Sequence, residues 1–167
     1  MKRMNLVILC SAYLFSPSML YAKTLNTQPK FTDYPMQIYK GPTAQLDKSD
    51  ADARLFRTRL SEGLKEKPDY AGEYVAVGWG CGAMCFSLTL ISKRTGKILN
   101  VFGGETGEKL IDIRPNSLLL VSHGSVQINE KDIYAKKFYL LKNNQLKLVY
   151  YTPLPTGSED DDNTLNP

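Results

Sequence analysis

GEYVAVGWGCGAMC, residues 72–85, is the least generic stretch of the sequence. It begins with strand-forming residues at 73–79, breaks into a Gly-rich loop, and continues as a second apolar strand over residues 85–92. The loop region holds the only Trp, Trp79, and two of the three Cys, Cys81 and Cys85. This pattern predicts a β-hairpin whose tip carries the unusual residues.

The first 22 residues have the pattern of an export signal. Lys2 and Arg3 supply positive charge, residues 6–15 form an apolar run, and Ala22 offers a small residue at a cleavage position. The apolar run is shorter than the roughly 20 residues that a membrane-spanning helix needs. We therefore expect a periplasmic or secreted protein, cleaved near Ala22, with no stable transmembrane segment afterwards.

Cleavage would leave 145 residues, a length that suits one domain. Without Lys2 and Arg3, 19 basic and 17 acidic side chains remain, a net charge of +2. Nucleic-acid-binding proteins instead cluster basic residues with aromatics, so no nucleic-acid partner is expected. Residues 156–167 contain four consecutive acids and are predicted to form a disordered acidic tail, which leaves a single domain over residues 23–155.

A helix followed by strands is the predicted order of elements. Apolar residues recur at helical spacing from the candidate N-caps Asp47 or Ser49 to residue 67, and Pro68 ends the pattern. Seven strands are then predicted, at residues 73–79, 85–92, 97–102, 109–113, 117–122, 133–141 and 145–151. Residues 36–39 could add a short strand, and residues 123–132 read as irregular. The predicted fold is α+β, with one N-terminal helix packed on an antiparallel six- to seven-stranded meander or partly closed barrel.

Cys81 and Cys85 are the only cysteines left after export to a compartment that favours oxidation, which predicts a disulfide bond. Gly80 and Gly82 give the loop the backbone freedom to close. Two alternatives stay open. Redox-active pairs usually have two intervening residues at a helix N-terminus, and a metal site would need more ligands than His123, the only His, can supply.

Trp79 can be read in two ways, as a core residue beneath the sheet or as a partly exposed anchor in a recognition loop. Trp is enriched at binding hot spots, and Met adapts to varied binding surfaces. Met84 lies at the same tip. The candidate binding loop therefore comprises Trp79, Gly80, Gly82 and Met84.

No catalytic set is predicted. His123 has serines nearby, but the nucleophile-elbow pattern is absent. Glu73 and Asp112 lie on predicted strands, and nothing in the sequence places them opposite each other as a pair of catalytic carboxylates. The glycines at 78–82 and 103–107 lack the complete dinucleotide- or phosphate-binding motifs, so neither a cofactor nor a metal is expected.

The motif Trp79-Gly80-Cys81-Gly82 followed by Cys85, with Ala71-Gly72-Glu73-Tyr74 before it, resembles the core of an uncharacterised family of small exported bacterial proteins. The match covers roughly residues 54–151. More diffuse support comes from residues 56–59 (FRTR), 95–97 (TGK) and 116–120 (NSLLL). The resemblance implies an exported bacterial protein and implies no particular activity.

The sequence thus favours a non-enzymatic periplasmic binding module, inhibitor-like or immunity-like, whose disulfide-closed Gly/Trp/Met loop meets an unknown envelope protein or ligand. One alternative is a thiol–disulfide exchange enzyme that acts through Cys81 and Cys85. A purely structural component of the envelope is the other.

Overall fold

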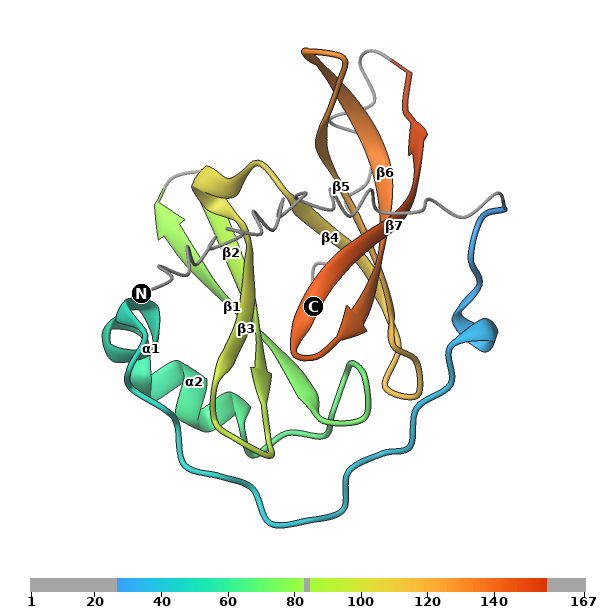
Figure 1. Cartoon of the computed structure of the whole chain (residues 1–167). Helices are drawn as coiled ribbons and strands as arrows, with labels where there is room; N and C mark the ends of the chain where they lie inside the picture. The colour runs from blue at the N-terminus through green and yellow to red at the C-terminus, as the bar shows by residue number, and fades with distance from the viewer. Residues whose placement is uncertain (1–26, 83–84, 156–167) are drawn as a thin grey trace, which may run out of the picture.

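The computed structural model describes residues 27–82 and 85–155 (Figure 1). Two short helices, α1 (Ala51–Leu55) and α2 (Arg57–Gly63), precede the strands, and 3-10 turns lie at η1 (Phe31–Asp33) and η2 (Gly104–Thr106). The strands are β1 (Tyr74–Gly82), β2 (Cys85–Ser92), β3 (Ile98–Gly103), β4 (Lys109–Ile113), β5 (Leu119–Ile128), β6 (Lys131–Lys142) and β7 (Gln145–Pro153). The predicted export signal, Met84 and the predicted acidic tail lie outside the described residues.

The strands form two antiparallel sheets, β1-β2-β3 and β4-β5-β6-β7, and neither sheet closes. The broad class, helices with antiparallel sheets, is confirmed, but the expected single meander or partly closed barrel is wrong. Gly103, Gly104 and Gly107 have φ angles of 74°, 53° and 62°. These left-handed conformations favour glycine, and they turn the chain out of the first sheet before β4 begins.

The three-stranded sheet has apolar packing on both faces. Alternate residues of a strand point to opposite faces. Accordingly, Val75, Val77 and Trp79 of β1 pack with the helices, whereas Tyr74 and Ala76 belong to the cluster that joins the two sheets. The far face of the second sheet packs against Phe31 and Tyr34. The first sheet thus lies between the helices and the second sheet.

The predicted continuous helix is interrupted. Helical geometry breaks at Phe56, where φ is −101° and ψ is 23°, and the Phe56 ring stacks on Trp79 with centroids 4.3 Å apart. The apolar spacing is the same on both sides of the break, so the sequence pattern does not reveal it. The interruption coincides with the tertiary contact between Phe56 and Trp79.

Side chains cap both ends of the helical pair. Asp50, rather than either N-cap expected from the sequence, accepts hydrogen bonds from two backbone N–H groups of α1 at 2.8 and 3.3 Å. Beyond α2, the Nζ of Lys93 donates to the backbone oxygens of Leu64 and Glu66 at 2.5 and 2.6 Å. Lys93 is buried, and its charge is placed favourably at a helix C-terminus.

Residues 123–132, expected to be irregular, are strand and turn. β5 and β6 form one long hairpin that projects away from the rest of the fold (Figure 1). Asn129 and Glu130 form its two-residue turn, with φ angles of 48° and 65°, the left-handed pair that suits the twist of a tight hairpin. Glu is an unusual residue for such a turn, which explains why the sequence pattern missed it. The expected turn at residues 142–144 is confirmed by Asn143 and Asn144, with φ angles of 53° and 56°.

An extended strap, residues 35–48, runs past both sheets from η1 to α1 (Figure 1). It forms backbone hydrogen bonds with three separate segments, including Tyr39 N to Gly72 O and Ala44 N to Lys93 O, both at 2.8 Å. Residues 36–39 are therefore part of the strap rather than the short strand that was considered. Gly72, with φ of 77°, allows this approach, because a Cβ there would lie 2.1 Å from the Gln37 oxygen.

The close approach of α2 to β1 predicts an unusual response to Gly63→Ala. Gly to Ala in a helix normally stabilises by about 1 kcal/mol. Here the new Cβ would lie 2.2 Å from Cγ2 of Val77, a stiff side chain. We expect the free energy of unfolding, measured with urea, to fall by about 1–3 kcal/mol. Ser61→Ala, on the exposed side of α2, is the control with little expected change. A more stable Gly63→Ala variant would contradict the packing.

The raised pKa of the Tyr74 hydroxyl predicts that the folded protein loses stability at alkaline pH. Burial, with a smaller contribution from Glu73, raises the pKa of Tyr74 to about 12 from 10.0. Because the folded pKa is the higher one, this stabilisation is complete below pH 10 and is lost as the pH rises toward 12. Urea unfolding across this range should show the decline, and the decline should be smaller in Tyr74→Phe. Equal declines in the two proteins would contradict the assignment.

Candidate functional site

The β1–β2 hairpin ends in a tip, described over residues 80–82 and 85–86, that is closed by a disulfide between Cys81 and Cys85. The predicted bond is confirmed, with Cα atoms 5.1 Å apart. Gly80 pairs with Phe86 and Gly82 with Cys85, so Cys81 is an extra residue in a bulge between them. Gly82 has a φ of 135°, which is strained for other residues. The bulge leaves Cys81 unpaired in the ladder and brings the two cysteines together, and pairing resumes at Gly82 and Cys85.

The disulfide packs against the connection between the two sheets. Ser87 Oγ donates a hydrogen bond to Cys81 Sγ at 3.4 Å. A Cβ on Gly104, in η2, would lie 3.8 Å from Cys81 Sγ and 4.0 Å from Cys85 Sγ. The bridge therefore lies next to the point where the chain leaves the first sheet. Cys81 is exposed and Cys85 is half-buried.

Trp79 lies in the core beneath the tip, with 6% of its surface exposed. Its ring packs on Phe56, and Val77 and Leu60 belong to the same cluster. The sequence left open whether Trp79 is a core residue or an exposed anchor, and the structure places it in the core. It supports the tip from below, and its side chain does not offer a partner an exposed anchor.

Phe86 is the exposed aromatic residue at the tip, and the sequence analysis did not single it out. Its exposed fraction is 55%. A Cβ on Gly78 would lie 2.2 Å from Phe86 Cζ, so the ring rests on the bare backbone of that glycine. Phe86 shares a face of β2 with Leu88 and Leu90, whose burial increases away from the tip. Two features of the sequence could have pointed to Phe86: the alternation of residues along β2, and the glycines of β1 that lie opposite its ring.

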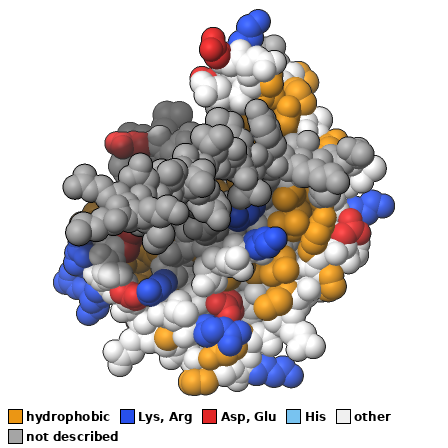
Figure 2. Space-filling view, in the orientation of Figure 1, with side chains coloured by type: hydrophobic (Ala, Val, Ile, Leu, Met, Phe, Trp, Pro, Cys, Tyr) orange, Lys and Arg blue, Asp and Glu red, His pale blue; other side chains and the backbone are white. Residues whose placement is uncertain are grey.

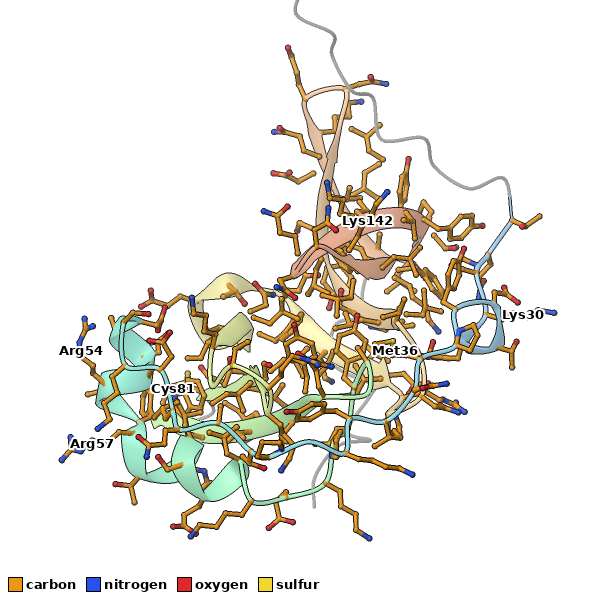
Figure 3. All side chains as sticks on the ribbon, turned by 60° about the horizontal axis from the view of Figure 1, so that its bottom comes forward. Lys30, Met36, Arg54, Arg57, Cys81 and Lys142 are labelled. Carbon is orange, nitrogen blue, oxygen red and sulfur yellow. A yellow bond between two sulfur atoms is a disulfide. The ribbon has the colours of Figure 1, made fainter. Side chains whose placement is uncertain are left out.

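Side chains cover much of the outer edge of β1. Arg59 Nε donates to the backbone oxygen of Gly78 at 2.5 Å, and Asp69 Oδ2 accepts from Ala76 N at 2.9 Å. Such contacts block pairing with a further strand. The tip therefore presents the face around Phe86 rather than an open strand edge. Figure 3 shows Arg54 and Arg57 pointing outward from the helices.

The other candidate residues are not brought to the tip. Glu73 accepts hydrogen bonds from Ser92 and Arg94, whereas Asp112 pairs with its neighbour Arg114 at 3.4 Å. The two carboxylates thus have separate partners and do not form a catalytic pair. His123 lies in β5, with its ring 6.3 Å from that of Tyr134.

A buried polar cluster of Glu108, Ser122 and Lys137 was also missed by the sequence analysis. Lys137 forms an ion pair with Glu108 and donates to the backbone oxygen of Ser125 at 3.1 Å. Ser122 Oγ donates to Glu108 Oε1 at 2.5 Å. Ser122 is fully buried and its proton is committed to a carboxylate, so it is not poised as a nucleophile. The cluster instead ties the start of β4 to β5 and β6.

Within the described ranges, no three His, Cys, Asp or Glu side chains gather in a way that could hold a metal ion. The helices in this part of the chain are too short to span a membrane. On the face shown in Figure 2, basic side chains are interspersed with acidic ones where the residues are described. Comparisons of the chain with protein-family models, curated proteins and solved structures give no match.

The disulfide should contribute modestly to stability, since it closes a very short loop. We expect Cys81→Ser/Cys85→Ser to lower the free energy of unfolding in urea by about 2 kcal/mol. The far-ultraviolet circular dichroism should be retained, because β1–β2 pairing and the packing of Trp79 do not need the bridge. Loss of the native spectrum, or no change in stability, would contradict this role.

Proposed function

We propose that the protein is an exported, periplasmic, non-enzymatic binding module that recognises a protein of the cell envelope through its tip. The recognition surface is Phe86 with Gly80, Gly82 and the Cys81–Cys85 bridge. An inhibitor-like or immunity-like role fits a surface that binds a partner without a catalytic set. The predicted export signal supports the periplasmic location.

One observation carries this proposal: a large aromatic ring is held in place and yet exposed. Phe86 rests on Gly78 and is paired with Gly80, so neighbouring side chains do not shield it. The disulfide beside it restrains the backbone. A ring that is ordered before binding loses little conformational entropy on binding, and aromatic residues are enriched in protein interfaces.

Capture of periplasmic proteins by the immobilised mature chain tests the proposal. Burying a Phe side chain contributes about 1.5–3 kcal/mol, so Phe86→Ala should weaken capture about 10- to 100-fold. The free energy of unfolding of the Phe86→Ala variant should change little, because the ring is largely exposed. Leu55→Ala is the matched control: Leu55 is 71% exposed and lies on α1, outside the proposed recognition surface.

Capture that is equal for wild type and Phe86→Ala would refute the recognition surface. Equal losses in Phe86→Ala and Leu55→Ala would also refute it, since the effect would then be general to exposed apolar residues.

Thiol–disulfide exchange is the second candidate function, because Cys81 is exposed as that chemistry requires. An exchange enzyme would have a reduction potential near or above about −200 mV, whereas structural disulfides usually lie below about −300 mV. Measuring the reduction potential of the Cys81–Cys85 bond therefore separates an exchange enzyme from a binding module with a structural disulfide. A structural envelope component would instead show no Phe86-dependent partner.

A further inference from the structure

A small hollow of about 160 Å³ lies at the other end of β1 from the tip. The strap, the residues before β1, the β2–β3 turn and the β6–β7 turn all contribute to it. In Figure 3, Met36, which lines the hollow, is well separated from Cys81 at the tip. The hollow is therefore a site distinct from the proposed recognition surface.

Arg94 is held in a fixed position at this hollow. Its Nε donates to Glu73 Oε2 at 2.6 Å, and its guanidinium carbon lies 4.4 Å from the centre of the Tyr39 ring. The other Glu73 oxygen accepts from Ser92 Oγ at 2.8 Å. Within the described part of the chain, the Nη groups of Arg94 donate no hydrogen bond. They form a planar pair of donors that is oriented before any ligand binds.

Two further residues of the hollow carry available donors. Asn144 accepts from the Tyr74 hydroxyl at 3.3 Å, which commits its Oδ1 and leaves its Nδ2 group to donate. Thr95 Oγ1 accepts from Lys97 N at 3.3 Å, so its hydroxyl proton is available. A lining that offers donors from Arg, Asn and Thr suits a ligand group rich in acceptors.

The apolar walls of the hollow and its small volume limit the kinds of ligand that can bind there. Met36, Ala71 and Leu141 supply apolar surface, and Met36 is 38% exposed. A water molecule takes up about 30 Å³ of liquid, so the hollow holds a group of only a few heavy atoms. A carboxylate with a short apolar side group matches both the donors and this space. Glu73 does not prevent it, because Arg94 can bridge two carboxylates.

We propose that this hollow binds a small carboxylate that carries a short apolar group. The carboxylate would be either a free acid or the C-terminal residue of a peptide, both of which present the same chemistry. Arg94 binds the carboxylate, Asn144 and Thr95 orient it, and Met36 and Leu141 contact the apolar group. Since the hollow is built from both sheets and the strap, bound ligand also stabilises the folded state by mass action.

Titration of the mature protein, followed by backbone amide chemical shifts in NMR, tests the site with three probes: propionate, N-acetylalanine and N-acetylalaninamide. Ligands this small should bind with Kd of about 0.1–10 mM. We expect saturable shifts at Thr95 and Asn144 with both acids and none with the amide. Tighter binding of N-acetylalanine than of propionate assigns the site to peptide C-termini, and equal or weaker binding assigns it to free acids.

Two variants and a control test the named donors. Arg94→Lys keeps the charge but loses the planar fork, and should raise Kd about tenfold. Asn144→Gly keeps the left-handed turn, where φ is 56°, while removing the amide, and should raise Kd about threefold. Arg57→Lys, on α2 away from the hollow, should bind like wild type. Binding of the amide as tight as the acid, no saturation by about 50 mM, or unchanged Kd in both variants would overturn the site.

Discussion

The stack of Trp79 on Phe56 is the contact on which much of the structure depends. It joins the end of β1 to the point where the two helices meet, and it buries the largest side chain of the protein in the helix-facing core. Because Trp79 points toward the helices, its neighbours in the bulge can turn outward. The order of the tip therefore comes from packing underneath it as well as from the disulfide.

The first sheet also has to be covered on its second face, and there polar groups accompany the apolar contacts. The Glu108–Lys137 pair and the Glu73–Arg94 pair both link segments that lie far apart in the sequence. No buried side-chain polar atom in the described residues lacks a hydrogen-bond partner. Removing one partner of a buried pair typically costs about 3–5 kcal/mol, a figure that applies to Glu108–Lys137 and not to Glu73–Arg94, in which the arginine side chain is half exposed. The Glu108–Lys137 pair therefore anchors the segment before β4 to β6, and the Glu73–Arg94 pair holds Arg94 in place at the small hollow.

Local patterns in the sequence predicted the elements better than their assembly. The disulfide followed from the two cysteines and their glycines, and the turn at Asn143-Asn144 followed from residues that tolerate positive φ. The helix break at Phe56 could not be predicted, because the apolar spacing is unchanged across it and the residue that Phe56 contacts lies 23 positions later in the chain. The split into two sheets was missed because Gly103, Gly104 and Gly107 read as an ordinary loop, and only their combined geometry shows that they redirect the chain.

For the tip, the sequence by itself predicted a hairpin between two strands and the disulfide that closes it. The register seen in the structure then places Trp79 and Phe86 on opposite faces. Trp79 pairs with Ser87 and Gly80 pairs with Phe86, so strand alternation separates the two rings. Only the tertiary structure decided which ring would be covered. The helices reach as far as Trp79, whereas the packing on the other face buries Leu90 and leaves Phe86 largely exposed. The extent of a covering layer depends on contacts between distant segments, and local periodicity does not encode it.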